Sequence, residues 1–428
     1  MRKNMFRSRL GLTLVLCICG VSLLSAQQQK EWSLAQLQNA AKAYYPLLKQ
    51  NDIYKQIADT RSSSVRTNFL PQASISGQAT YQSEVTELKI PIPGAAGFSQ
   101  KPDQYSIGLE LKQNLFDYGA VRTQVAIEQT GAAQQAEQLA IEYQKIKDRI
   151  NQLYGTINLQ LENKKILQLR LNELEAKIKK MQAAVDAGAA LKSNLLLLSS
   201  EQLATLQKME EANSNLNTWY NVLSLLTNQR IDTTCVFTDL QRAVPLASTA
   251  VRAEYRLFDL QTHTLQLKEK MIAKTNLPKV YVFGRGYYGR PGFNFLNNSF
   301  RPYGMVGAGL AWNLTNYYTA NKDNKVLQLN TQLLQNQKSI FAINLESTLS
   351  QQRAEITKLE RLLVLDAQIV AAKTSIRAVS SSQLDNGVIT PADYLVDLNA
   401  ENQAQFNLKL HEIQLLMAKE NYNNTLGY

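Results

Sequence analysis

Two stretches of this chain repeat one another at an offset of 199 residues: YSIGLELKQNLFDY at residues 105–118 and GMVGAGLAWNLTNY at residues 304–317. They share five identities in fourteen positions, where average composition gives about one. The same offset relates three further pairs: Gly188 and Gly387, Asn194 and Asp393, Leu196 and Leu395. The sequence therefore predicts two structural repeats, each with an arm of the same length beyond the shared stretch.

A Leu-Pro dipeptide precedes a candidate strand in both halves, at Leu70-Pro71 and Leu277-Pro278. Its offset is 207 residues, so the halves differ by eight residues between this point and the next strand. We expect that difference to lie in a loop. Proline restricts the residue before it to extended conformations, so Pro71 and Pro278 are predicted to end a helix and begin a strand.

The first 26 residues have the pattern of a secretory signal peptide. Four basic residues precede an apolar run from Leu10 to Leu24, and Ser25-Ala26 supplies the small residues of a cleavage site. The run is shorter than the ~20 residues of a spanning helix, which disfavours a membrane anchor. Cys17 and Cys19 follow Leu16 and Ile18 rather than small residues, so lipidation is not expected. We predict export and cleavage after Ala26.

The charge and the reactive side chains exclude several classes of protein. Without the signal segment the formal net charge of +11 falls by four to +7, and it is spread along the chain rather than grouped, so nucleic acid is not an expected partner. Cys235 is then the only cysteine, which rules out an intrachain disulfide. His263 and His411 lack metal-ligand spacing, and no phosphate loop or nucleophile motif occurs. We expect no metal, no cofactor and no catalysis.

Long stretches lack helix breakers. Neither glycine nor proline occurs in the 77 residues from Leu310 to Asn386, a length of about 115 Å if helical, which does not fit inside a compact domain. Elsewhere apolar residues recur at steps of three and four, a period of 3.5 that is typical of coiled coils. The members of these seams are Leu167, Leu171, Leu174, Ile178, Met181 and Val185; Leu206, Met209, Asn213, Leu216, Tyr220 and Leu223; and Phe406, Leu410, Ile413 and Met417.

Two turns between long helices can be predicted from their residues. In the second half Gly387 ends one helix, and the next begins at Thr390-Pro391-Ala392-Asp393, with Thr as N-cap, Pro in the first turn and Asp as the capping acid. In the first half Gly188 ends a helix, and Ser193 or Asn194 can cap its successor. Both turns are predicted tips of helical hairpins.

Four strands are predicted in two pairs. Apolar and polar residues alternate in residues 72–83 and 105–112, and less regularly in residues 279–290 and 302–314. Strands of about ten to twelve residues have the length that crosses a bilayer at a tilt. Aromatic residues near the strand ends are candidates for a membrane girdle: Tyr81, Tyr105, Tyr287, Tyr288, Tyr303 and Trp312. The segments 84–104 and 291–301 between the paired strands are expected to be loops.

Such a chain cannot complete its sheet alone. Four strands leave two open edges, which a membrane does not tolerate, and four are too few to close a barrel. Subunits must therefore pool their strands, in a symmetric ring with a shared barrel at one end and a helical tube at the other.

The order of short motifs resembles the TolC-like outer membrane efflux protein family over nearly the whole mature chain. The motifs are Leu70-Pro71-Gln72, the stretch from Gln113 to Gly119, Ala187-Gly188, Asn386-Gly387 and Asp393-Tyr394-Leu395. The resemblance implies a homotrimer in outer membrane lipid, with a twelve-stranded barrel continued by a helical tunnel through the periplasm. It also implies a periplasmic adaptor protein and an inner-membrane pump as partners.

The resemblance places functional residues at the hairpin tips. An acid one turn beyond Gly387 commonly faces the periplasmic mouth, so three copies of Asp393 would form a cation-attracting ring; alternatively, Asp393 only caps its helix. The family's second acid falls on Val396, with Asp397 following it, and Asn194 adds no charge. The residues expected at the tips and the adaptor contact are Gly188, Ser193, Gly387, Thr390 and Pro391.

We divide the chain into eight segments: a signal peptide (1–26), an N-terminal helix (27–71), a β-hairpin (72–116), a helical hairpin (117–230, tip 188–194), an equatorial connection (231–250), a helix (251–277), a second β-hairpin (278–314) and a second helical hairpin (315–428, tip 387–393). The favoured function is a passive exit duct for small molecules. Type I protein secretion and a structural or adhesive coiled-coil protein of the envelope are the alternatives.

Overall fold

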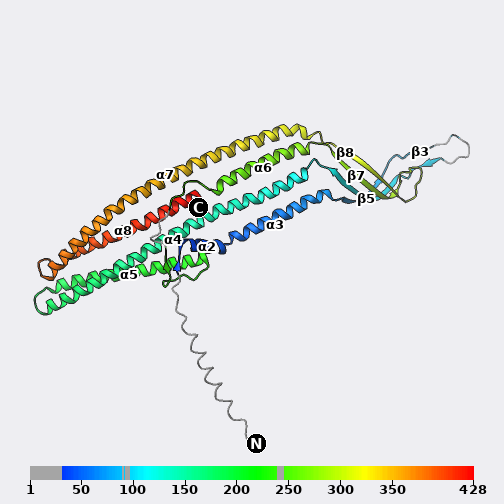
Figure 1. Ribbon diagram of the computed structural model, residues 1–428. Coiled ribbons are helices and arrows are strands. Elements are labelled where there is room, and N and C mark those ends of the chain that lie inside the picture. Colours follow the sequence, from blue (N-terminus) through cyan, green and yellow to red (C-terminus); the bar gives the residue numbers. More distant parts are fainter. Residues whose placement is uncertain (1–30, 89–90, 92–96, 239–244) are drawn as a thin grey trace, which may run out of the picture.

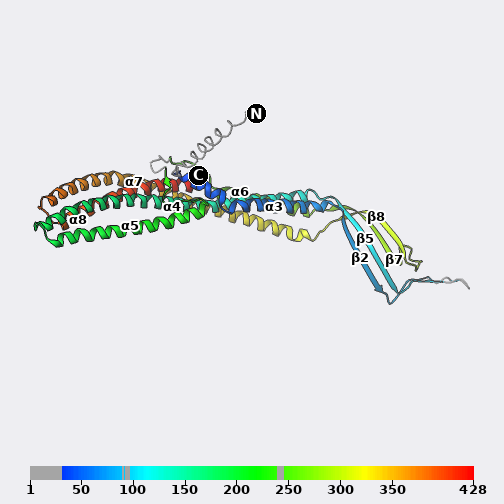
Figure 2. The ribbon, with the colours of Figure 1, turned by 90° about the horizontal axis from the view of Figure 1, so that it is seen from below.

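The computed structural model describes residues 31–88, 91, 97–238 and 245–428. The molecule is long and narrow, with helices along most of its length and a four-stranded sheet at one end (Figures 1 and 2). This arrangement confirms the predicted fold class, a mixed α and β protein with two repeats. The signal segment 1–26 and its cleavage site lie outside the described residues.

The sheet is antiparallel, with strand order β2-β5-β7-β8. Its strands are β2 (Gln72–Tyr81), β5 (Asp103–Phe116), β7 (Lys279–Arg290) and β8 (Arg301–Ala311). The outer strands β2 and β8 therefore leave two open edges. A small hairpin of β3 (Glu87–Leu88) and β4 (Phe98–Ser99) extends the connection between β2 and β5.

Each strand of the sheet continues into one long helix or follows one. Helix α3 (Leu47–Arg66) leads through η1 (Thr67–Phe69) into β2, and β5 leads into α4 (Ala120–Asp186). Helix α6 (Ala253–Thr275) leads into β7, and β8 leads into α7 (Asn316–Asp385). The helices pack in the order of their strands, α3 on α4, α4 on α6 and α6 on α7 (Figure 1). Pro71 and Pro278 stand immediately before β2 and β7, where their missing N–H costs no ladder bond.

The far half of the molecule consists of two helical hairpins, α4 with α5 (Lys192–Thr227) and α7 with α8 (Pro391–Leu426). Helices α4 and α7 have 67 and 70 residues, and α5 and α8 have 36 each. Arms of nearly equal length bring the two tips to the same pole (Figure 1). The two sequence repeats therefore correspond to two helical hairpins whose tips lie at the same end of the molecule.

Several buried clusters hold the helices together, and two of them contain the largest fully buried side chains. The larger lies at mid-length, where α2 (Leu34–Tyr44), β1 (Glu31–Trp32) and β6 (Val236–Phe237) pack on α4 and α5 around Leu37, Tyr154 and Tyr220. The other lies towards the tips, around Tyr394 and Leu398. Each fully buried apolar side chain contributes roughly 1.5–3 kcal/mol.

The structure corrects three details of the predicted elements. The single N-terminal helix over 27–71 is divided into α2 and α3, because Pro46 follows Tyr45, whose backbone is extended. Strand β8 ends at Ala311 rather than at residue 314, and helix α7 begins at Asn316. In α5 the buried position is Thr205, at 1% exposed, while Leu206 is 44% exposed.

No helix among the described residues is both long enough and apolar enough to cross a membrane.

Candidate functional site

The four-stranded sheet has two chemically different faces. Residues paired across antiparallel strands share a face, so the register places the odd-numbered residues of β2 and β5 with the even-numbered residues of β7 and β8. This apolar face is open: Ile75 is 77% exposed, Val306 88% and Leu310 64%. The opposite, polar face carries residues such as Ser74, Glu110 and Arg285. A sheet with one exposed apolar face fits contact with lipid.

Aromatic side chains lie at both ends of the apolar face. At the end away from the helices, the rings of Tyr105 and Tyr288 stack on Phe300 with centroids 6.2 and 6.1 Å apart. Tyr81, 80% exposed, lies at the same end, where β2 pairs with the start of β5. At the helical end, the indole Nε1 of Trp312 donates to the carbonyl of Asn276 at 2.9 Å. Two aromatic belts flanking an apolar band are typical of membrane strands.

Tyr287 and Tyr303 do not lie with the other residues of the expected girdle. They pair with each other across β7 and β8, on the polar face, and their rings stack at 5.4 Å. The ring of Tyr287 covers Gly108, where a Cβ atom would come within 2.1 Å of it. The sequence suggested a girdle position because these tyrosines are near strand ends, but the register turns them to the other face.

The two hairpin tips have the same backbone turn. Gly188 and Gly387 have φ of +72° and +70°, a conformation that glycine adopts without steric cost. The N–H of Ala189 donates to the carbonyl of Ala184 at 2.8 Å, and that of Val388 donates to Gln383 at 2.8 Å. These are the six-residue bonds of the Schellman motif, which closes a helix. Both glycines therefore terminate helices as predicted.

The second tip starts its next helix with a capping box. The Thr390 side chain accepts from the N–H of Asp393 at 3.3 Å, and the Asp393 carboxylate accepts from the N–H of Thr390 at 3.1 Å. The Thr390 hydroxyl also donates to that carboxylate at 2.6 Å. These hydrogen bonds from Thr390 lower the pKa of Asp393. With Pro391 at the start of α8, the predicted cap is confirmed, and Asp393 is exposed as well.

The first tip has no equivalent cap, which corrects the prediction for Ser193 and Asn194. Helix α5 begins at Lys192, its N-cap is Leu191, and no side chain accepts from its first turn. The N–H of Asn194 donates instead to the carbonyl of Leu191 at 3.0 Å. The helix begins too early for either side chain to stand at the N-cap.

Asp397 is engaged within the subunit. It is partly buried and accepts a hydrogen bond from the hydroxyl of Ser380 on α7. The structure thus separates the candidate aperture residues, with Asp393 exposed at the tip and Asp397 facing the neighbouring helix of its own hairpin.

A charged network joins the two hairpins just above the tips. Arg377 on α7 donates to Glu401 on α8 at 2.7 Å and to Glu173 on α4 at 3.0 Å. The hydroxyl of the fully buried Tyr394 donates to Glu173 at 2.5 Å. Burial, together with Glu173, strongly raises the pKa of Tyr394, so the hydroxyl keeps its proton. We call Glu173, Arg377, Tyr394 and Glu401 the hairpin network.

A second contact between the hairpins lies nearer the tips. Lys177 and Lys180 on α4 each donate to a carboxylate oxygen of Asp385 on α7 at 2.8 Å. Burial raises the pKa of Asp385, but the two lysines outweigh it and the net pKa is lowered. Both contacts tie the first repeat to the second at the pole where the tips lie.

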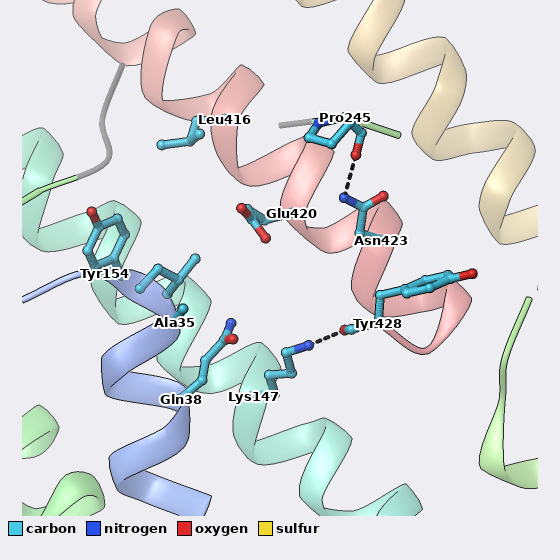
Figure 3. Close-up of a pocket in the computed structure, with 10 residues that line it drawn as sticks. Ala35, Gln38, Lys147, Tyr154, Pro245, Leu416, Glu420, Asn423 and Tyr428 are labelled. Atoms are coloured by element: carbon cyan, nitrogen blue, oxygen red, sulfur yellow. Dashed lines mark hydrogen bonds between the residues drawn. The ribbon is translucent and has the colours of Figure 1, made fainter. Parts of the chain in front are cut away.

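A cavity of about 220 Å³ lies at mid-length between α2, α4 and α8 (Figure 3). Lys147 donates to the backbone carbonyl of Tyr428, and the Asn423 amide donates to the carbonyl of Pro245 at 2.9 Å. Burial lowers the pKa of Lys147. The polar groups of this cavity bond within the chain, where they connect the C-terminal end of the chain to α4, and α8 to Pro245. Among the described residues no group of three or more potential metal-ligating side chains occurs.

Comparison with known proteins identifies this combination of sheet and tunnel helices. Residues 37–229 match the family model of the outer membrane efflux protein. Over these residues the chain is similar to the outer membrane efflux protein family. This match supports an outer membrane exit duct of an efflux system as the function of the chain. No curated protein matches the chain.

Solved structures share the fold of this chain. VceC from Vibrio cholerae has 14% identity and a TM-score of 0.65, with 91% of this chain and 96% of that chain covered. CmeC from Campylobacter jejuni has 11% identity and a TM-score of 0.67, with 92% and 85% covered. The open state of MtrE from Neisseria gonorrhoeae has 13% identity and a TM-score of 0.62, with 92% and 88% covered.

Sequence reasoning missed the hairpin network. The signal in the sequence was charge complementarity between the repeats. Glu173 and Lys177 of the first repeat form ion pairs with Arg377 and Asp385 of the second. Such residues look like ordinary solvated charges until the two hairpins are known to pack side by side.

Proposed function

We propose that three copies of this efflux protein form the exit duct, with their twelve strands in one barrel in the outer membrane and their helices extending into the periplasm. The observation that carries the proposal is a four-stranded sheet with two open edges and an exposed apolar face. Pairing β8 of one copy with β2 of the next satisfies both edges. The proposal includes export with cleavage after Ala26.

The helices supply further support for a ring. Helices α3 and α7 are the first and last in the row of helices α3, α4, α6 and α7 that pack side by side. Each of the two exposes apolar residues. On α7 these residues recur at steps of three, four and seven: Val326, Leu329, Leu333, Ile340 and Ile343. On α3, Ile53 and Ile57 are one turn apart and also exposed. Seams of this period pack against a helix of another subunit.

At the periplasmic end we propose a mouth that is narrowed by the tips and held by the hairpin network. The exposed Asp393 carboxylates of three copies would form a ring of negative charge, which attracts cations and must separate to pass a large solute. The cap that Asp393 makes with Thr390 is compatible with this role, since the carboxylate stays exposed.

We propose a periplasmic adaptor protein and an inner-membrane pump as partners. The tips expose apolar side chains beside their turns: Leu191 is 70% exposed and Val388 is 69% exposed. Apolar side chains that are exposed beside both turns are suited to bind a partner protein. The tip residues Gly188, Ser193, Gly387, Thr390 and Pro391 shape this surface.

Small molecules are the cargo that we favour, and type I protein secretion is the second candidate. A purely structural or adhesive role does not use an apolar sheet face of membrane length. The 12 residues of β7, at about 3.3 Å each and a tilt of about 40°, cover roughly 30 Å of bilayer.

The test is to isolate outer membranes, look for a heat-modifiable trimer, and record conductance of the purified protein in planar bilayers. We expect a trimer in the outer membrane fraction that dissociates on boiling and forms channels of uniform conductance. A monomer confined to the soluble periplasmic fraction would refute the exit duct.

A further inference from the structure

We propose that the polar face of the sheet, as the lumen wall of the barrel, favours organic anions that carry an aromatic ring, of the aryl sulfonate or aryl carboxylate class. This inference rests on the proposed duct, because only a closed barrel turns the polar face inward. It assigns a substrate class to the outer-membrane end of the path, independently of the acidic ring proposed at the periplasmic end.

Positive charges dominate the polar face. By the strand register it comprises the even-numbered residues of β2 and β5 and the odd-numbered residues of β7 and β8. The only acid on it is Glu110, whereas four residues are cationic: Lys112, Lys279, Arg285 and Arg301. Each chain therefore contributes an excess of three positive charges, and three copies triple that excess around one lumen.

The cations are spread along the path rather than gathered at one level. Lys279 starts β7 at the helical end, Lys112 pairs with Phe283, Arg285 pairs with Glu110, and Arg301 pairs with Gly289 at the far end. These levels span ten residue-to-residue steps along β7, from Lys279 to Gly289, or roughly 33 Å. An anion would meet a cation at each stage of its passage, and rings of Lys and Arg select anions in pores.

Most of this charge is not neutralised within the subunit. Glu110 accepts from Arg285 at 3.0 Å. Among the described residues, Lys112, Lys279 and Arg301 have no ion pair with a carboxylate. Lys112 instead lies over the ring of Tyr281, 3.9 Å from the centroid. Its charge remains available to a passing anion, since a ring face orients a cation without cancelling its charge.

Aromatic rings stand between the cations on the same face. The rings of Tyr281, Phe283 and Tyr287 occupy the space above Gly309, Gly307 and Gly108, where a Cβ atom would collide with them. The guanidinium of Arg285 lies 4.7 Å from the Phe283 centroid. A flat aromatic solute can stack on such a ring while its acidic group bonds to the adjacent cation. An aliphatic anion of equal charge gains only the second contact.

The experiment compares the wild-type trimer with the triple variant Lys112→Gln, Lys279→Gln and Arg301→Gln in planar bilayers. The first measurement is the reversal potential in a KCl gradient. The second is current block by benzene-1,3-disulfonate and by propane-1,3-disulfonate, added on the extracellular side, where the probe reaches the sheet before the tips. We expect the triple variant to lower the chloride-to-potassium permeability ratio at least about two-fold. We also expect the aromatic probe to block the wild type more strongly than the aliphatic one.

The matched control is Arg230→Gln, which removes a cation 93% exposed beyond α5 and is expected to leave both measurements unchanged. If the triple variant does not form trimers, Lys112→Gln alone is used. Conductance with an unchanged permeability ratio, or equal block by the two sulfonates, would overturn the inference and leave the duct intact. A wild-type protein without any conductance would refute the proposed duct itself.

Discussion

At the scale of single residues, the second tip shows how one cap can serve both structure and charge. Thr390 and Asp393 satisfy each other's backbone N–H groups, and the same bonds lower the pKa of Asp393. Its folded-state pKa is thus below its unfolded value of about 3.9. The stabilisation is present above that value and is lost as the pH falls through the folded pKa. At neutral pH the carboxylate is both the cap and a fixed negative charge.

We predict that Thr390→Ala weakens the start of α8 by about 1 kcal/mol, the usual cost of losing an N-cap, and raises the pKa of Asp393 towards its ordinary value. Hydrogen exchange of the first turn of α8 measures the first effect, and carboxyl titration by NMR measures the second. Ser193→Ala at the first tip is the matched control, because Ser193 caps nothing there. Equal loss of protection in both variants would contradict the capping role.

At the scale of helices, the hairpin network is one of the contacts that join the two repeats near the hairpin tips. Glu401 is 4% exposed, and its cation Arg377 is 25% exposed. Removing Arg377 leaves Glu173 and Glu401 without that cation. We predict that Arg377→Gln loosens the hairpins by about 2–3 kcal/mol, less than for a fully buried pair because Arg377 is partly solvated.

The measurement for the network is single-channel conductance, which should rise in Arg377→Gln as the tips separate more easily. Lys358→Gln is the control on the same helix, since Lys358 forms an exposed pair with Glu355, one turn away. Conductance that rises equally in both variants would mean that the loss of a positive charge, and not the link between the hairpins, determines how wide the proposed mouth opens.

The same elements show what the sequence could reveal. Local chemistry was sufficient for Gly188, Gly387 and the Thr390 cap, because turns and caps depend on residues within one turn of the helix. The sequence did not reveal which face of a strand or helix a residue occupies, or which helices pack together. The face that Tyr287 and Tyr303 occupy depends on the strand register. The burial of Thr205 rather than Leu206 depends on the rotation of α5 about its axis. The bond from Arg377 to Glu173 depends on how the two repeats pack.

At the scale of the whole molecule, the proposed barrel requires the edge strands of different copies to pair. Within a chain, β2 and β8 are separated by β5 and β7, so their backbones are roughly 14 Å apart. A disulfide needs Cα atoms about 4.4–6.8 Å apart. Cysteines placed on β2 and β8 of the same chain can therefore bond only between copies.

We predict that Ser76→Cys combined with a cysteine at an odd-numbered position of β8, 303, 305 or 307, gives covalent trimers on a non-reducing gel. Ser76 and these positions lie on the polar face of the sheet, and paired residues must share a face. Cysteines at 304, 306 or 308 lie on the apolar face and serve as controls that should not link to Ser76→Cys. The native Cys235 is buried away from the sheet. Links at even positions, or none at any position, would show that the barrel does not close through β2 and β8.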